Sequence, residues 1–222
     1  METRSWAVEV GSHEVSARVD AADAGDAAPV FVFAHGAGGH MLDRGMEALA
    51  SQFHACGLTV VRFNFPYRER GSGRPDPMPV LQQCVAAVVA SARDRIAAKR
   101  WILGGRSMGG RAASMLAADH FACDALLLLA YPLHPAGEPA KLRDAHLARI
   151  TVPVLCLNGT RDPLCRRDLM DAVVTRLPGN FRMHWLEGAD HSFHVLKSSG
   201  RTDADVLSEI GDATRQWVAR PT

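Results

Sequence analysis

Residues 103–110, which read LGGRSMGG, constrain this chain more than any other stretch. They follow residues 100–103 (RWIL), which predict the end of a buried strand. They lead into residues 111–118, which have the Ala, Leu and Met content of a helix. Residues 105–109 match the pattern G-x-S-x-G, which is informative only between a strand and a helix. The sequence therefore predicts a sharp strand-to-helix turn with Ser107 at its tip.

The glycines of this pattern have a physical purpose. A strand that turns at once into a helix brings the positions two before and two after its central residue close together, so both must be small. Gly105 and Gly109 meet this demand. Ser107 then lies at the first turn of a helix, where unpaired N–H groups and the helix dipole favour negative charge.

Other glycine-rich turns fit these residues less well. A phosphate-binding loop of the form G-x-x-x-x-G-K-[ST] would need Lys where Arg111 follows Gly110, and the dinucleotide fingerprint G-x-G-x-x-G is absent here. A plain Gly-rich turn with an incidental serine remains the alternative. A nucleophilic serine is the interpretation that we favour.

Composition narrows the class of protein. The 222 residues suit one α/β domain over 1–222. With 25 basic and 24 acidic residues and no Lys/Arg tract, we expect no nucleic-acid partner. No apolar run is long enough to span a membrane, and the first residues lack the apolar core of a signal peptide.

The five cysteines are odd in number and form no C-x-x-C pair, and most of them lie in apolar segments. They predict small core residues in a reducing cytoplasm rather than disulfides. They are Cys56, Cys84, Cys123, Cys156 and Cys165.

Strands and helices alternate along the chain, which predicts a mostly parallel sheet covered by helices on both faces. A hairpin (5–10 and 14–19) and a surface loop (20–29) come first. Helices are expected at about 42–57, 80–98, 111–118, 166–177 and 203–218. Further strands are expected at 30–34, 58–65, 100–103, 125–130, 152–157 and 181–186. Residues 67–79 read as an exposed loop, and residues 134–149 leave little room for a helical lid.

A serine hydroxyl needs a base to take its proton and a carboxylate to orient that base. In a sheet of this kind, such groups follow later strands, in the order serine, acid, histidine. Asp162 follows the strand at 152–157, and His191 follows the strand at 181–186. We therefore expect Ser107, Asp162 and His191 to form a catalytic triad at the carboxyl edge of the sheet.

Each of these assignments has a rival. Asp162 could belong to a simple Asp-Pro turn. Asp190 is a second candidate acid, but it adjoins His191 in sequence and is expected to point elsewhere. His194 is a second candidate base. A metal site built on His191 and His194 lacks a third ligand at suitable spacing, so no metal or cofactor is expected.

A serine nucleophile also needs groups that stabilise the negative charge formed on the substrate oxygen. Attack on an acyl carbon creates an oxyanion, which two backbone N–H groups can bind. Met108, the residue after the serine, offers one. Residues 35–39 (HGAGG) follow the strand at 30–34, and there Ala37 is the expected second donor, with Gly38 next.

Together these motifs resemble the α/β-hydrolase superfamily over nearly the whole chain. More narrowly, residues 104–111 (GGRSMGGR), 130–135 (AYPLHP), 158–163 (NGTRDP) and 188–193 (GADHSF) resemble a dienelactone-hydrolase-related branch of predicted hydrolases. That branch includes animal testis-expressed and chromatin-complex-associated hydrolase-like proteins. The resemblance implies Ser107 as nucleophile, Asp162 as acid and His191 as base. Dienelactone hydrolases proper use a cysteine nucleophile, so their specific reaction is not implied.

The sequence thus predicts a serine hydrolase that cleaves a small carboxylic ester or related acyl bond. Two alternatives stay open: a hydrolase-fold scaffold without turnover, and an acyltransferase. Arg106, Arg111 and Arg68 are candidates for binding an anionic substrate, against the alternative that each pairs with a surface carboxylate. The natural substrate, leaving group and oligomeric state are not predicted.

Overall fold

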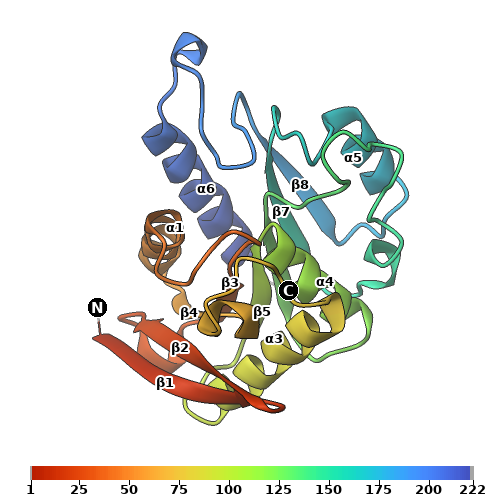
Figure 1. Ribbon diagram of the computed structural model, residues 1–222. Helices are drawn as coiled ribbons and strands as arrows, with labels where there is room; N and C mark the ends of the chain where they lie inside the picture. Colours follow the sequence, from red (N-terminus) through yellow and green to blue (C-terminus); the bar gives the residue numbers. More distant parts are fainter. Residues whose placement is uncertain (1, 221–222) are drawn as a thin grey trace.

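A single sheet organises the protein. The computed structural model describes residues 2–220, in which eight strands form one sheet in the order β1-β2-β4-β3-β5-β6-β7-β8 (Figure 1). β1 and β2 form an antiparallel hairpin, β2 pairs antiparallel with β4, and the remaining neighbours are parallel. The predicted mostly parallel α/β sheet is confirmed.

The strands are Glu2–Val10 (β1), His13–Ala21 (β2), Val30–Ala34 (β3), Thr59–Phe63 (β4), Trp101–Arg106 (β5), Ala125–Leu129 (β6), Val154–Gly159 (β7) and Phe181–Leu186 (β8). The α-helices are Arg44–Ala55 (α1), Pro66–Glu69 (α2), Met78–Arg93 (α3), Met108–Ala118 (α4), Arg167–Val174 (α5) and Asp203–Val218 (α6).

Helices cover both faces of the sheet, as Figure 1 shows. α1 and α6 pack on one face, where their apolar side chains join those of β3, β6 and β7 in one core cluster. α3, α4 and α5 pack on the other face in a second, larger cluster. Because both faces are buried, the central strands are continuous apolar runs, and every residue of β3 and β6 is buried.

The chain adds strands first on one side of β3 and then on its other side. β4 follows β3 on one side, whereas β5 lies against the other side of β3 and leads on to β6, β7 and β8. Loops that leave neighbouring strands in opposite directions open a crevice at the carboxyl edge of the sheet. Here the loop after β3 and the turn after β5 meet at that crevice.

Two N-terminal predictions are wrong in detail. β2 continues to Ala21, two residues into the predicted loop, because buried Asp20 pairs with buried Arg62 of β4 at 2.8 Å. Leu42, expected on the buried face of a helix, lies before α1 and is 42% exposed, whereas Met46 and Leu49 are buried as predicted.

The region between β4 and β5 also differs from expectation. Residues 67–79 are not one exposed loop: Pro66 starts the short helix α2, and Tyr67 is fully buried. α3 starts at Met78, because Pro79 suits the first turn of a helix, and it ends at Arg93 rather than 98. Ile96 therefore packs on the core from a loop.

Residues 134–149 carry no lid helix, as predicted, and contain only a short 3-10 turn at Leu147–Arg149. They are less exposed than their polarity suggests, since His134 and His146 are both buried. Among residues 2–220, no helix combines the length and hydropathy that a bilayer crossing requires.

Burial of His146 has a consequence for stability. Its Nε2 lies 2.9 Å from Ser114 Oγ, and burial, followed by the nearby charge of Arg111, lowers its pKa to about 4. In the unfolded chain the same imidazole titrates near its ordinary pKa of about 6.5. Below that pH the unfolded state binds more protons than the folded state, so stability falls as the pH drops from about 6.5 towards 4.

We predict that His146→Gln makes the free energy of unfolding less sensitive to acid. The variant takes up one proton fewer than the wild type on unfolding. The slope of the free energy of unfolding against pH, between about pH 6 and 5, should therefore fall by up to about 1.4 kcal/mol per pH unit. Urea denaturation at pH 7.5, 6 and 5 measures it. The control is His120→Asn, which removes an exposed imidazole from a left-handed backbone position that Asn tolerates. An unchanged slope in His146→Gln would contradict the prediction.

Candidate active site

The turn after β5 holds Ser107 in a strained conformation. Its φ is 51° and its ψ −117°, which L-residues rarely adopt and which costs of order 1–3 kcal/mol. Two backbone hydrogen bonds stabilise this conformation. The Ser107 N–H donates to the carbonyl of Leu129 at 2.8 Å, and the Ser107 carbonyl accepts from the Arg111 N–H at 3.0 Å. The predicted strand-turn-helix is confirmed, with Ser107 at the N-cap of α4.

Close backbone packing explains the two glycines of the pattern. A Cβ on Gly105 would lie 2.4 Å from the carbonyl oxygen of Ala34, and one on Gly109 would lie 2.6 Å from the carbonyl oxygen of His35. Both contacts are far shorter than van der Waals distances. The turn and the start of α4 therefore press directly against the end of β3, which brings the loop at residues 35–39 beside Ser107.

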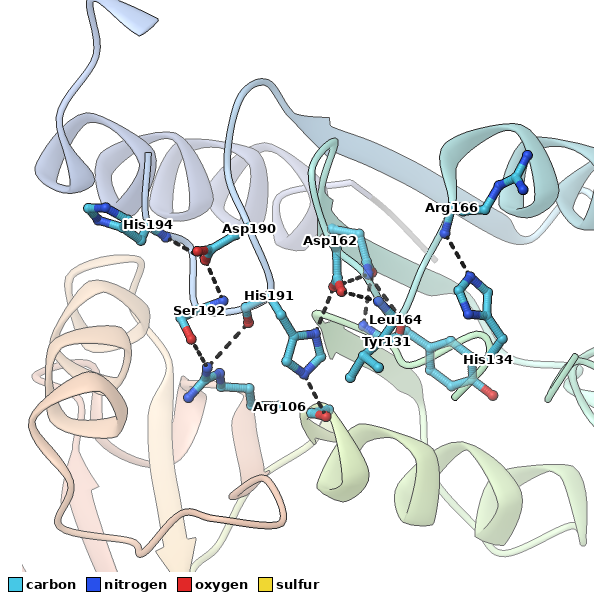
Figure 2. Close-up of polar contacts among 12 residues, drawn as sticks. Arg106, Tyr131, His134, Asp162, Leu164, Arg166, Asp190, His191, Ser192 and His194 are labelled. Carbon is cyan, nitrogen blue, oxygen red and sulfur yellow. Dashed lines mark hydrogen bonds and ion pairs between the residues drawn. The ribbon is translucent and has the colours of Figure 1, made fainter. Parts of the chain in front are cut away.

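The three residues predicted to act together are hydrogen-bonded in one chain. The Ser107 hydroxyl lies 2.9 Å from Nε2 of His191, and Nδ1 of His191 lies 2.8 Å from Oδ2 of Asp162 (Figure 2). Because the Asp162 carboxylate accepts a hydrogen bond from the Nδ1–H group, the Nε2 lone pair faces the serine hydroxyl.

Asp162 is held in its orientation by buried donors. Its side chain is fully buried; Oδ1 accepts from the Leu164 N–H at 2.8 Å, and Oδ2 accepts from the Asn158 side-chain amide at 3.3 Å. Asn158 also binds both backbone groups of Tyr131, so it ties the end of β6 to the acid. Sequence reasoning missed Asn158. Its position at the end of a buried strand, where a polar side chain needs partners, was the available signal.

The loops that carry Asp162 and His191 are also in direct contact. The Arg161 N–H donates to the carbonyl of Ala189 at 2.9 Å. A Cβ on Gly159 would lie 2.1 Å from that same oxygen, so only glycine permits this approach. Contact between these two loops brings Asp162 and His191 within hydrogen-bonding distance.

Neither rival residue joins this chain of bonds. Oδ1 of Asp190 accepts from the N–H groups of Ser192 and His194, which closes the tight turn containing His191. In Figure 2 the His194 ring points away from His191. It pairs with Asp203 at 2.9 Å, and its side chain is 58% exposed. The geometry thus favours Asp162 and His191 over Asp190 and His194.

Hydrogen bonds to backbone carbonyls fix the orientation of the loop at residues 35–39. The carbonyl of Gly36 accepts from Nδ1 of His35 at 2.8 Å, and the carbonyl of Ala37 accepts from the Tyr67 hydroxyl at 2.6 Å. Nε2 of His35 accepts from the Phe65 N–H, and burial lowers the pKa of this histidine to about 4, so the ring is neutral and its tautomer is set. Sequence reasoning missed the roles of His35 and Tyr67.

These bonds determine where two N–H groups point. In a trans peptide the C=O and the N–H are antiparallel, so fixing the Gly36 and Ala37 carbonyls turns the Ala37 and Gly38 N–H groups to the opposite side. Across the described part of the chain, neither N–H meets a protein acceptor, and both residues are exposed. Met108 begins α4, so its N–H also lacks an intrahelical acceptor.

The three candidate arginines do not form surface ion pairs. Arg68, Arg106 and Arg111 are each partly buried, and each has a buried Nε without an acceptor. Among residues 2–220, none of the three has a carboxylate oxygen within 4.0 Å. Arg106 instead donates through Nη2 to the carbonyl of His191 and to Ser192 Oγ, both at 3.2 Å.

No cluster of three or more His, Cys, Asp or Glu side chains in the described residues is arranged to hold a metal ion. All five cysteines are free thiols. Burial raises the pKa of Cys84, Cys156 and Cys165, which keeps these thiols protonated.

Comparison with known proteins agrees with this architecture. A family model described as alpha/beta hydrolase domain matches residues 27–219. The chain therefore belongs to the α/β-hydrolase family, as the sequence motifs predict, and its sheet and helices form the α/β-hydrolase fold.

Solved structures resemble the chain over almost its full length. Est1E from Butyrivibrio proteoclasticus, solved with ferulic acid bound, has a TM-score of 0.79 at 15% identity and covers 97% of this chain and 100% of its own. XC6422 from Xanthomonas campestris, an α/β serine hydrolase without a lid, has a TM-score of 0.75 at 20% identity. The match covers 100% of this chain and 97% of XC6422. A dienelactone hydrolase from Anabaena variabilis has a TM-score of 0.73 at 17% identity (97% and 96%). At such identities the likeness shows the fold.

We predict that Gly109→Ala destabilises the protein. The added Cβ would meet the His35 and Ala34 carbonyl oxygens, so α4 must shift, at a typical cost of about 1–3 kcal/mol. The matched control is Gly45→Ala in α1, where a Cβ meets open space, which should stabilise by roughly 0.5–1 kcal/mol. Urea denaturation compares the two. Equal stability of the two variants would show that the turn does not depend on this contact.

Proposed function

We propose that this protein is a serine hydrolase that cleaves a small carboxylic ester, or a related acyl bond, through an acyl-enzyme intermediate. The observation that carries the proposal is the chain of hydrogen bonds from the Ser107 hydroxyl through His191 to the buried Asp162. Nothing about folding requires a strained serine, a half-buried histidine and a buried carboxylate to meet in this order. Nucleophilic catalysis does require it.

In the proposed mechanism, Ser107 Oγ attacks the ester carbonyl carbon while Nε2 of His191 takes the hydroxyl proton. The tetrahedral intermediate collapses as the bond to the leaving oxygen breaks, and His191 gives its proton to the departing alcohol. Water then attacks the acyl-enzyme with His191 again as base, which releases the carboxylic acid and restores Ser107. Asp162 holds the imidazole in the required tautomer and stabilises its charged form.

The developing oxyanion needs donors that are already in place. We assign Met108 and Ala37 as the two N–H donors, with Gly38 beside them. The antiparallel geometry of the tethered peptides and the unpaired N–H groups support this assignment. The helix dipole of α4 adds a favourable field at the same point.

Membership of the α/β-hydrolase family supports hydrolysis over other chemistries. Est1E, a neighbour in fold, binds ferulic acid, and XC6422 is a serine hydrolase without a lid. The short segment at residues 134–149 leaves the present site similarly uncovered and suits small substrates. We propose one domain over 1–222, with no nucleic-acid partner, and five free thiols suit a reducing compartment such as the cytoplasm.

We predict that a fluorophosphonate probe labels Ser107 and that 4-nitrophenyl acetate is hydrolysed. Ser107→Ala should abolish labelling, and His191→Gln should lower kcat by roughly 10⁴-fold or more, because the base is lost. His194→Gln is the matched control and should retain labelling and turnover. Mass spectrometry locates the label, and release of 4-nitrophenolate measures the rate.

Other outcomes would replace this proposal. Absence of labelling in well-folded protein would favour a scaffold without turnover. Transfer of the acyl group to added alcohol or amine in preference to water would instead identify an acyltransferase, and product analysis distinguishes the two reactions.

We predict further that Tyr67→Phe lowers kcat by roughly tenfold. It removes the bond that orients the Ala37–Gly38 peptide, and the loss should be smaller than the 10²–10³-fold that follows deletion of an oxyanion donor. Tyr131→Phe is the matched control, since its hydroxyl donates to the carbonyl of Arg143 at 2.6 Å and does not touch this loop. Equal kcat values for the two variants would contradict the assigned role of Tyr67.

A further inference from the structure

A cavity lies beside the candidate site and has no part in the proposed mechanism. Its volume is about 430 Å³, and it lies between α1, α6 and the end of β5. Leu49, Phe193 and Leu207 give it apolar walls, whereas Arg44, Arg106 and Asp203 supply charged groups. A larger cavity of about 600 Å³ is lined by Arg100, Phe181 and Trp217 and, unlike the first, by no residue adjacent in sequence to Ser107 or His191.

The cavity adjoins both groups that would carry out the chemistry. Arg106 precedes Ser107 in the chain, and Ser192 follows His191; both line the cavity. Consecutive Cα atoms lie about 3.8 Å apart, so the cavity begins within one residue of the proposed nucleophile and base. Figure 2 shows the Arg106 side chain reaching towards the His191 carbonyl and the Ser192 hydroxyl. This adjacency is the basis for placing the acyl chain of a substrate bound at Ser107 Oγ in this space.

The positive charge in this cavity is poorly compensated. Among the described residues, the Arg106 guanidinium donates hydrogen bonds only to the His191 carbonyl and Ser192 Oγ, and its buried Nε has no acceptor there. Desolvation lowers the pKa of Arg106, although Asp190 and Asp162 oppose this from further away. Arg44 is exposed and forms no ion pair with any described side chain.

The nearby carboxylates are already engaged. Asp203 accepts from the Val195 N–H and pairs with His194, and both bonds are 2.9 Å long. Asp190 accepts from two N–H groups of its own turn. Two guanidinium groups thus face a cavity whose acidic neighbours are bound elsewhere, an arrangement that attracts an anion.

We propose that this cavity binds a carboxylate carried by the substrate, so that the enzyme prefers monoesters of short dicarboxylic acids. The apolar walls would pack against the methylene chain between the two carbonyl groups. The guanidinium groups of Arg106 and Arg44 would bind the far carboxylate. This inference rests on the proposed function, because it assumes that Ser107 is acylated.

The test compares two substrates that share leaving group and acyl length. Mono-4-nitrophenyl adipate carries the carboxylate, and 4-nitrophenyl hexanoate does not. The wild-type enzyme should favour the adipate in kcat/KM, and 0.5 M salt should reduce this preference, because salt screens partly exposed charges. Arg44→Gln should reduce the adipate-to-hexanoate ratio by roughly tenfold, mainly through KM, since a charge-assisted bond is lost.

Arg95→Gln is the matched control. It neutralises an exposed arginine that follows α3 and precedes β5, at the opposite edge of the sheet, and it should keep the wild-type ratio. Arg106→Gln should also reduce the ratio, and both rates should fall as well, because Arg106 contacts the turn that carries His191.

The outcomes separate this inference from the proposed function. Ser107-dependent hydrolysis of both esters, with a ratio that neither Arg44→Gln nor Arg106→Gln changes, would overturn the carboxylate site and leave the hydrolase intact. A thermal-shift assay on Ser107→Ala protein tests binding without turnover. Stabilisation by adipate that is lost when Arg44 is also replaced would support the carboxylate site. Absence of both hydrolysis and adipate binding would overturn both proposals.

Discussion

The close packing of the turn after β5 against the end of β3 is the contact on which the rest of the site depends. Gly105 and Gly109 lie where any side chain would collide with the carbonyl oxygens of Ala34 and His35. This approach lets the chain turn from strand to helix with Ser107 at a φ of 51°. The same contact brings the start of α4 next to the glycine-rich loop, so that one packing feature positions both the hydroxyl and the N–H groups proposed to act with it.

Polar groups around the site are oriented by partners that are themselves buried. Asp162 accepts from Asn158 and from the Leu164 N–H, so its carboxylate is held in a fixed orientation beside His191. His35 is neutral and ties the loop beside Ser107 to the backbone after β4. Such preorganisation matters for catalysis, because groups that are already oriented need not reorganise as charge develops.

Charge is distributed unevenly around the proposed nucleophile. The Asp162 carboxylate lies behind His191 and is fully buried, whereas Arg106 lines a cavity with apolar walls. The partly buried Arg106 guanidinium, which pairs with no carboxylate among the described residues, carries a desolvation cost that a bound carboxylate would offset. The arrangement thus links two proposals, the acyl chemistry at Ser107 and the selection of an anionic acyl group. The acyl chemistry does not depend on the selection of an anionic group.

The sequence by itself determined the alternation of strands and helices, the turn at Ser107 and the order serine, acid, histidine, because these depend on local periodicity and on residues adjacent in the chain. The sequence already favoured Asp162 over Asp190 and His191 over His194 from their positions after the strands. Only the tertiary structure shows which loops touch, and so which of these side chains are hydrogen-bonded to one another and to Ser107. It also revealed Asn158, Tyr67 and the cavity beside Arg106. Tyr67 lies in a segment whose composition predicts an exposed loop, yet its hydroxyl bonds to a carbonyl 30 residues earlier. Contacts of this kind are set by packing between distant segments, and no local pattern in the sequence records them.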